Sequence, residues 1–497
     1  MQNLKYIFSL LFAVGLLTMA TSCEDFVERY PRASIAEEEV MKDMEGVTAT
    51  LAGLYHRMSA GTYNHREMNL AGELLSDQMD IAESNAGRMT SHPTTEEGAG
   101  FGLWNRLYDD INRTNTIIHR IDDIEDADPV EVERAKGQAH AIRGHLYFDL
   151  LRVYARPYLH QEPLVQGEPL GVILKTEPFT GIDERTFQER ATIDESYQLV
   201  LDDLYQALEY MDDDLSDFPY RFNPVSVKAN LARVHLYMGN WQEAADYAQE
   251  VIDDAPVSLV DADDRESYLT VFADAPGEES IFELGFAGGD DRPSMNTSVA
   301  GMASYEREGS EGYGDVILRR DLVNLLEEYG DWGHPGDEMH YFREKGGQDC
   351  WFQDKYSSYR GDAWWDDIKV IRMAEMYLIA AEALYEAGQE TQAEEKLMEL
   401  REHRGMCDVS IQESIDAMDD VDDFIDLVLT ERRVELFSEM SHRWFDLRRR
   451  GMDITKGVEG DDARGGDPLD FEDYRVVERI PISEVEANEN CIQNPGY

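Results

Sequence analysis

Apolar and small residues recur at helical spacing in several long segments of the chain. In residues 136–158, positions such as Ala139 and Ile142 follow each other at intervals of three or four and so share one helix face. The same periodicity predicts helices at residues 37–59, 103–124, 192–211, 226–252, 370–405 and 421–450. The helix that starts near residue 192 has two candidate N-cap residues, Thr192 and Asp194. The pattern predicts a mainly α protein.

Two of these segments have the pattern of a helical hairpin. In residues 226–252 and 370–405, small and large residues alternate on either side of a glycine, Gly239 or Gly388. A helix with small residues, a turn and a second helix are typical of tetratricopeptide repeats. Each hairpin buries a face only against a neighbour, so several hairpins must stack. The fold class that we expect is mainly α, with stacked tetratricopeptide-like hairpins.

Two long regions lack helical periodicity. Residues 254–367 are rich in glycine, aspartate, serine and aromatic residues, and residues 451–497 contain only short apolar pieces. The first region is too long for an ordinary connection, so we expect it to be functional or folded on its own. The predicted helical scaffold therefore covers about residues 35–253 and 368–450.

The start of the chain has the features of an export signal. Lys5 precedes the apolar residues 7–19, which are too few to span a bilayer but suit the core of a cleaved signal. Residues 20–22 and Cys23 resemble a bacterial lipoprotein cleavage box, although alanine stands where leucine is commonest. We expect residues 1–22 to be a signal peptide and Cys23 to be acylated. Cleavage nearby with a spare thiol, or a disulfide at Cys23, are the alternatives.

The charge of the chain is strongly negative. It has 103 acidic and 45 basic residues, a net charge of −58. Such a surface repels nucleic acid and anionic lipid head groups, so neither is an expected partner. Salt screens the self-repulsion, because the Debye length falls to about 3 Å at 1 M. We therefore predict a halophilic source.

Metal and cofactor motifs are missing from the sequence. Cys350, Cys407 and Cys491 are scattered without zinc-site spacing, and the histidines lack the HExxH pattern. The acidic loops 261–266 and 285–293 do not keep the order of an EF-hand. No Walker A, dinucleotide or G-x-S-x-G motif occurs. We expect no metal and no cofactor.

Several segments in a fixed order resemble one known family. The strongest are LTERRVELFSEMSHRWFDLRRRGM (429–452), RIPISEVEANENCIQNPGY (479–497) and VIRMAEMYLIAAEAL (370–384), with weaker support from ELLSDQMD, LWNRLYDDINRTN and ESIFELGF. Together they resemble the SusD-like (RagB/SusD) family of outer-membrane nutrient-binding lipoproteins, over residues 23–497. Glu24 and Asp25 resemble the acidic tag that sends lipoproteins of Bacteroidetes-type bacteria to the cell surface.

The resemblance implies a fold, a function and partners. It implies one SusD-like domain at residues 23–497, an α-α superhelix anchored by lipid in the outer membrane. It further implies capture of an oligosaccharide, a polysaccharide or another nutrient for a SusC-like TonB-dependent transporter, without bond breaking. Residues 254–367 then become the ligand-binding region and residues 451–497 a C-terminal loop segment.

In this family, binding residues come from loops, which here are residues 80–102, 304–315 and 356–367. The polar candidates are Asp80, Asn85 and Arg88, and the aromatic candidates are Tyr305, Tyr313, Trp364 and Trp365. Aromatic rings pack on the C–H face of a sugar, and polar groups bond its hydroxyls. The alternatives are a solvated loop for the polar residues and core filling for the tryptophan pair.

Two other functions remain open from the sequence. Glu431 and Glu435 are a carboxylate pair of the kind that runs glycoside hydrolysis. With 103 acidic residues chance pairs are common, and alternating charges here also suit ion pairs at i,i+3 and i,i+4 that pin the C-terminal helices to the scaffold. A purely protein-binding tetratricopeptide scaffold is the third hypothesis.

Overall fold

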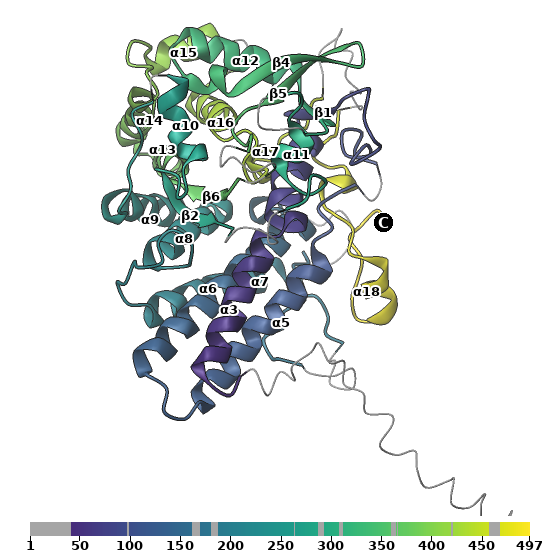
Figure 1. Cartoon of the computed structure of the whole chain (residues 1–497), viewed down its shortest axis with the longest axis vertical. Coiled ribbons are helices and arrows are strands. Elements are labelled where there is room, and N and C mark those ends of the chain that lie inside the picture. Colours follow the sequence, from purple (N-terminus) through teal and green to yellow (C-terminus); the bar gives the residue numbers. More distant parts are fainter. Residues whose placement is uncertain are drawn as a thin grey trace, which may run out of the picture.

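The computed structural model describes residues 41–96, 99–161, 169–179, 187–262, 264–286, 293–307, 312–358, 364, 366–418, 421–456 and 468–497. The predicted signal peptide and Cys23 lie outside these ranges. Within them the chain is mainly helical, as the periodicity predicts (Figure 1).

Long helices form a bundle in the lower half of the molecule (Figure 1). They are α3 (Met44–Ser59), α5 (Trp104–Arg120), α6 (Pro129–Tyr154) and α7 (Ile193–Tyr210). Helix α6 packs against α5 and α7, and α3 packs against α5 and α6. Ala139 and Ile142 of α6 are fully buried, so the periodic face predicted from the sequence is the packed face.

Two stacked hairpins continue the helical layer. The first is α8 (Pro224–Met238) with α9 (Trp241–Asp254), and the second is α13 (Met373–Glu386) with α14 (Glu390–His403). Helix α13 packs against both α14 and α9, which stacks the hairpins. Gly239 and Gly388 make the turns with φ of 72° and 78°, a left-handed conformation that favours glycine. Both predicted hairpins are confirmed.

Further helices cover the upper part of the molecule. The longer ones are α12 (Arg320–Asp331), α16 (Phe424–Glu435) and α17 (His442–Arg449). Shorter helices, in the upper part and elsewhere in the molecule, are η1 (Gly61–His65), η2 (Glu67–Ala71), α4 (Gly72–Leu75), η3 (Ile121–Asp123), η4 (Tyr158–His160), α10 (Arg265–Ala273), α11 (Val299–Ala303), η7 (Pro335–Met339), α15 (Ile411–Ala417), η8 (Tyr474–Val476) and α18 (Ile482–Ala487).

The helix expected at residues 421–450 is interrupted. It becomes α16 and α17, because Ser438, Met440 and Ser441 have φ of 62°, 44° and 54° and so leave the right-handed helix. The Ser441 hydroxyl donates to the carbonyl of Met68, 2.7 Å away. The break between α16 and α17 therefore coincides with a hydrogen bond to a segment far away in the chain, and the apolar pattern of residues 421–450 gives no sign of it.

Short strands form two antiparallel sheets. β1 (Met79–Ile81), β3 (Val316–Leu318), β5 (Gln348–Gln353) and β4 (His340–Lys345) lie side by side in that order, and β2 (Ser280–Leu284) pairs with β6 (Ile368–Arg372). The region 254–367, which the sequence marks as irregular, therefore contains strands and helices joined by loops. The strands have three to six residues, and apart from the β4–β5 hairpin they pair with segments distant in the chain, so their apolar alternation is hard to recognise in the sequence.

Buried ion pairs hold α16 to the helical stack. Glu435 lies 2.6 Å from Arg372, the residue before α13, and 2.8 Å from Arg404, the residue after α14. Glu431 pairs with Arg401 of α14. All these side chains are buried. The expectation that these charges pin the C-terminal helices is confirmed, but the partners lie on other elements and not at i,i+3 or i,i+4.

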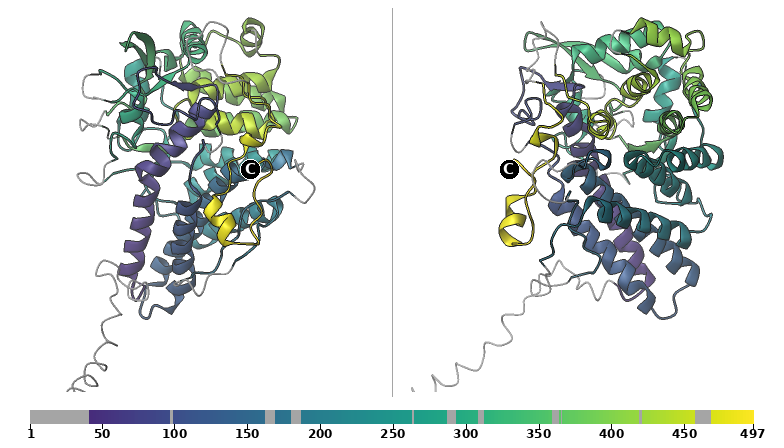
Figure 2. Two further views of the ribbon diagram at one scale, coloured as in Figure 1. Left: turned by 90° about the vertical axis from the view of Figure 1, so that its right-hand side faces the viewer. Right: turned by 180° about the vertical axis from the view of Figure 1, so that it is seen from behind.

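The C-terminal segment runs along the side of the helical bundle, in yellow in both views of Figure 2. The backbone N–H of Glu478 donates to the carbonyl of Val153, and the Asn494 amide donates to the carbonyl of Tyr154. The last thirty residues are therefore bonded to the end of α6 and belong to the same body as the helices.

Candidate ligand-binding site

A strand pair brings two of the three predicted binding loops together, residues 80–102 and 304–315. β1 pairs with β3, with Asp80 opposite Ile317. One residue beyond β1, the N–H of Ala82 donates to the carbonyl of Asp315, 2.9 Å away. The loop that follows residue 82 therefore lies against the loop that ends at Asp315, although the two are more than 200 positions apart in the chain.

Arg88 is bonded to the second loop. Its guanidinium donates to Asp315 at 2.8 Å and to the Asn296 side chain at 3.0 Å. The Cζ atom of Arg88 also lies 3.8 Å from the centre of the Tyr313 ring, a close cation–π contact. Arg88 and Tyr313 are both partly exposed, and Asp315 is buried. The structure therefore places Arg88 and Tyr313, which the sequence analysis named in two different loops, in direct contact.

Tyr305 lies on the same face of the sheet. Its backbone N–H donates to the Tyr341 hydroxyl at 2.8 Å, and its ring lies 5.8 Å from that of Phe352 in β5. The backbone of Gly314, with φ of 58°, passes so close that a Cβ at this position would lie 2.6 Å from the Cβ of Tyr305. A glycine is therefore needed for this loop to seat the tyrosine.

The β4 strand adds residues that the sequence interpretation did not include. The guanidinium carbons of Arg343 and Arg307 lie 5.2 and 5.6 Å from the centre of the Tyr341 ring. The Lys345 ammonium lies 5.4 Å from the Tyr305 ring. Tyr341, Arg343 and Lys345 are two positions apart, which places them on one face of a strand. That alternation is the signal that could have identified them.

Burial and hydrogen bonding perturb two of these groups. Burial lowers the pKa of Lys345, and the neighbouring Asp315 carboxylate, 3.5 Å away, opposes the shift. A hydrogen bond with the Glu306 carboxylate raises the pKa of Tyr305. The Lys345 ammonium also donates to the carbonyl of Gly314 at 2.7 Å, which ties β4 to the tyrosine-bearing loop.

Asp80 and Asn85 have structural positions. Asp80 is fully buried in β1 and pairs with the equally buried Arg319 at 2.9 Å, so the expectation of a loop side chain facing a ligand or solvent is corrected. A carboxylate this deep is stabilised by its arginine. Asn85 is partly exposed and closes a turn: its amide donates to the Ala82 carbonyl, and its oxygen accepts from the N–H of Gly87.

The tryptophan pair is only partly described. Trp364 is half-buried with φ of 67°, and its backbone N–H donates to the Ser358 hydroxyl at 2.7 Å. Trp365 lies outside the described residues. Both interpretations of the pair, ligand contact and core filling, therefore stay predictions.

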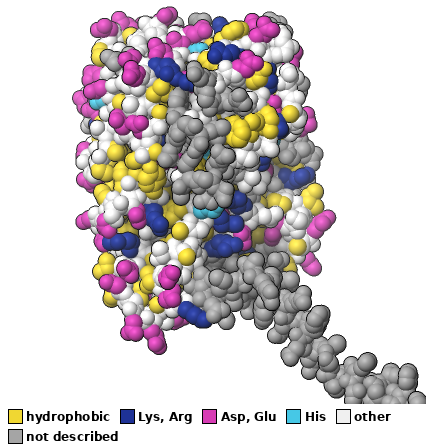
Figure 3. Space-filling view, viewed as in Figure 1, with side chains coloured by type: hydrophobic (Ala, Val, Ile, Leu, Met, Phe, Trp, Pro, Cys, Tyr) yellow, Lys and Arg dark blue, Asp and Glu magenta, His cyan; other side chains and the backbone are white. Residues whose placement is uncertain are grey.

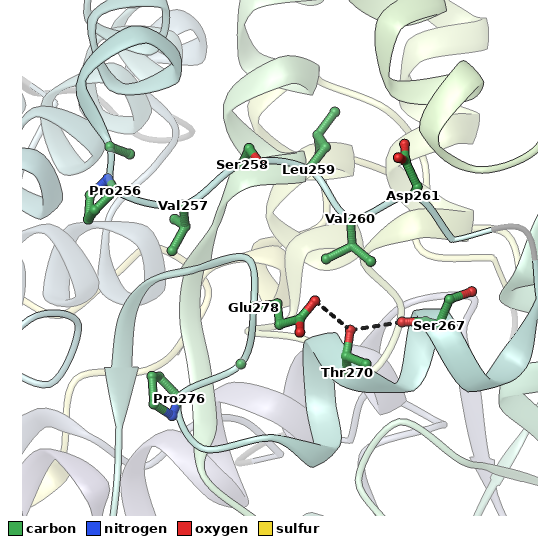
Figure 4. Close-up of a pocket in the computed structure, with 12 residues that line it drawn as sticks. Pro256, Val257, Ser258, Leu259, Val260, Asp261, Ser267, Thr270, Pro276 and Glu278 are labelled. Atoms are coloured by element: carbon green, nitrogen blue, oxygen red, sulfur yellow. Dashed lines mark hydrogen bonds between the residues drawn. The ribbon is translucent and has the colours of Figure 1, made fainter.

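Hollows elsewhere in the molecule do not involve these residues. A groove of about 990 Å³ runs between the extended segment 255–261 and the loop 276–278, where Glu278 accepts a hydrogen bond from Thr270 (Figure 4). A cavity of about 480 Å³ lies between α5, residues 173–179 and α18. The predicted site is instead formed by three tyrosines and four cations, which we call the Tyr–Arg face: Tyr305, Tyr313, Tyr341, Arg88, Arg307, Arg343 and Lys345. Arg343 is exposed, Lys345 is buried, and the others are partly exposed.

The described residues contain no group of three His, Cys, Asp or Glu side chains that could hold a metal ion. Cys350, Cys407 and Cys491 are free thiols. Among the described helices, none is both long and apolar enough to cross a bilayer.

The fold and this surface define a class of protein, in which stacked helical hairpins support a surface formed by short strands and loops. Comparison with known proteins names the family. A model described as "SusD family" matches residues 351–497, and one described as "Starch-binding associating with outer membrane" matches residues 25–236. The chain belongs to the SusD-like family.

Individual relatives agree along most of the chain. SusD-like protein P38 of Formosa agariphila is 26% identical, with 90% of this chain and 91% of the relative covered. A SusD superfamily protein from Bacteroides vulgatus has a TM-score of 0.77 and 25% identity, with 92% of this chain and 99% of the other covered. A laminarin-binding SusD-like protein has a TM-score of 0.68 and 22% identity, with 92% and 100% covered.

Proposed function

We propose that this protein is a cell-surface lipoprotein that binds a glycan on the Tyr–Arg face and delivers it to a SusC-like TonB-dependent transporter. The observation that carries the proposal is the union of Arg88, Tyr313 and Tyr305 on one surface. Tyrosine rings offer flat apolar faces to sugar rings, and the adjacent guanidinium groups donate hydrogen bonds. A structural neighbour that binds laminarin supports a glycan as the ligand class.

We further propose how the chain is processed, attached to the membrane and located. Residues 1–22 are a signal peptide, Cys23 carries the acyl chains, and residues 23–497 form a single SusD-like domain at the outer membrane. Asn85 shapes the turn before Arg88, and Trp364 and Trp365 belong to the proposal as further contacts with the ligand. The match to a family described as associating with the outer membrane supports this location.

We propose binding without catalysis. Glu431 and Glu435, the carboxylate pair considered for hydrolysis, are buried and held by Arg401, Arg372 and Arg404. A glycosidase needs its two carboxyl groups open to the sugar. This arrangement supports a structural role for the pair.

The test is calorimetric titration of the mature protein with a panel of oligosaccharides. At least one should bind saturably, and the double variant Tyr305→Ala, Tyr313→Ala should weaken that binding by about tenfold or more, because each ring loses its contact area. Tyr205→Ala is the matched control, since Tyr205 is a 38% exposed tyrosine on α7, away from the Tyr–Arg face.

The same incubation is assayed for new reducing ends. Binding without turnover agrees with the proposal, and steady turnover points to a hydrolase instead. If no oligosaccharide binds while the protein is folded, the proposal is wrong and the scaffold hypothesis gains.

A further inference from the structure

We propose that the glycan recognised by the Tyr–Arg face is anionic, with carboxylate or sulfate groups on its sugar rings. This inference rests on the proposed function and names the chemical class of its ligand. It comes from the charges of the face, which differ from those of the chain as a whole.

Cations are concentrated on this face of an otherwise acidic protein. The chain has more than twice as many acidic as basic residues, 103 against 45. Yet Arg88, Arg307, Arg343 and Lys345 all lie within 6 Å of the ring centre of one of three neighbouring tyrosines. The excess of acidic residues in the chain would not lead one to expect four cations close together.

The two carboxylates that pair with these cations are buried. Asp315 is 2% exposed and accepts from Arg88 and Lys345. Asp354 is 3% exposed and pairs with Arg307 and with Arg265. These carboxylates hold the cations in place from the buried side, and they are too little exposed to accept hydrogen bonds from a ligand at the surface.

Arg343 is the most available of the four cations. It is exposed, and within the described part of the chain its guanidinium donates to the carbonyl oxygens of Glu306 and Phe342 and pairs with no carboxylate. Glu306, whose backbone carbonyl accepts from Arg343, is itself an exposed acid, and its carboxylate raises the pKa of the neighbouring Tyr305. A guanidinium without a carboxylate partner beside a flat ring is a ready site for an anion.

Strand alternation separates the charges of the β4–β5 hairpin. Arg343 is opposite Cys350, and Lys345 is opposite Gln348, on the Tyr–Arg face. Glu344 is opposite Asp349, so these two acids point to the other face. The hairpin therefore places the exposed Arg343 and the buried Lys345 on the side of the Tyr–Arg face, and its two acids on the other side.

The hydrogen-bonding capacity of the face favours an anion over a neutral sugar. A sugar hydroxyl both donates and accepts, so neutral glycans need acceptors as well as donors. Arginine and lysine have donors only. With Asp315 and Asp354 buried, the arginines of the face offer donors only, which match carboxylate or sulfate oxygens, whereas its acceptors are the tyrosine hydroxyls and Glu306.

The net charge of −58 would repel a polyanion from a distance in dilute buffer. In concentrated salt that repulsion is screened beyond about 3 Å, whereas direct guanidinium–anion contacts persist in part. We therefore expect binding of an anionic glycan to be retained at high salt.

The experiment compares three probes by calorimetry in 1 M NaCl: oligogalacturonides for carboxylate groups, carrageenan oligosaccharides for sulfate groups, and laminarin oligosaccharides as the neutral probe. At least one anionic probe should bind tenfold or more tightly than the neutral one. Arg343→Gln should weaken anionic binding by about tenfold, the effect of losing one charge-assisted contact. Comparing the two anionic probes separates carboxylate from sulfate recognition.

Arg320→Gln is the matched control. Arg320 lies 4.4 Å from the ring centre of Trp351, an arginine over an aromatic ring like Arg343 but on the opposite face of the hairpin, and its loss should leave binding unchanged. The inference is overturned, with the proposed function intact, if the neutral probe binds as tightly as the anionic ones or if Arg343→Gln has no effect. If no glycan binds at all, the proposed function itself fails.

Discussion

Arg88 shows how burial assigns roles to single charged residues. It reaches the buried Asp315 with one nitrogen and lies over the exposed side of Tyr313, so it joins two loops and faces outward. Asp80, a few positions earlier, is fully buried against Arg319 and faces no solvent. Both residues look alike in sequence, as charges in a polar loop, and only their burial separates a binding group from a structural one.

Glu73 is expected to make the stability of the protein fall as pH rises. It is fully buried, and burial raises the pKa of its carboxyl to about 8. Because the folded pKa exceeds the unfolded one, its contribution is complete below about pH 4.5 and is lost as pH rises through 8. Relative to the wild type, Glu73→Gln should gain on the order of 4 kcal/mol between pH 5 and pH 9. Urea unfolding at both values measures this, and a constant difference would contradict it.

Glu435 should be among the residues least tolerant of change. Glu435→Gln leaves Arg372 and Arg404 buried with less opposing charge, and removal of one partner of a buried ion pair destabilises a protein by about 3–5 kcal/mol. The control is Asp212→Asn, which removes an exposed pair with Arg134 and should change stability by less than about 1 kcal/mol. Denaturant unfolding of both variants decides. Equal effects would show that burial does not determine how much these ion pairs contribute to the free energy of unfolding.

At the scale of elements, helices follow local pattern and strands follow distant contacts. The start of α7 illustrates the first case, since Thr192 accepts from the N–H of Glu195 and the Glu195 carboxylate accepts from the N–H of Thr192. Of the two predicted N-caps, the structure selects Thr192. β1 and β3 illustrate the second case, because each has three residues and exists through its pairing with the other and with neighbouring strands.

The cap of α7 gives a matched pair of substitutions. Thr192→Ala should destabilise the protein by about 1 kcal/mol, because it removes the capping hydrogen bond. Asp194→Asn removes only a charge in the first turn and should have a smaller effect, a few tenths of a kcal/mol. Thermal or urea unfolding compares them. A larger effect at Asp194 would mean that the helix dipole outweighs the cap.

At the scale of the whole molecule, acidic side chains spread over the face seen in Figure 3, and basic ones form smaller groups between them. Many of the cations are used inside: Arg233, Arg319, Arg372, Arg401, Arg404 and Arg432 are among the largest fully buried side chains. Each of these arginines is buried with a carboxylate partner, so the pairs leave the net surface charge nearly unchanged but raise the proportion of acids among the charged groups that remain at the surface. This distribution explains why the cations of the Tyr–Arg face stand out.

Salt should stabilise the folded protein. With a net charge of −58, self-repulsion is strong in dilute buffer and is screened in 1–2 M NaCl. We expect the melting temperature, followed by circular dichroism, to rise by several degrees between 0.05 and 2 M NaCl, and KCl to act similarly. An equal melting temperature in dilute buffer would remove the prediction of a halophilic protein.

The sequence by itself determined the helical layer. The apolar period of α6, the glycine turns at Gly239 and Gly388 and the family motifs near the C-terminus are local or ordered along the chain, so they can be read without coordinates. It also named Arg88, Tyr305 and Tyr313 as candidates. It missed Tyr341 and Arg343, and it placed Asp80 on an exposed loop.

Only the tertiary structure decided which of those residues meet. Pairing of β1 with β3 joins segments more than 200 positions apart and accompanies the burial of Asp80. Pairing of β3 with β5 then sets the β4–β5 hairpin, which carries the exposed Arg343, beside them. The physical reason is that a three-residue strand has too few side chains to specify its partner by local pattern. Its pairing, and therefore the burial of each charge beside it, is fixed by the packing of the whole chain.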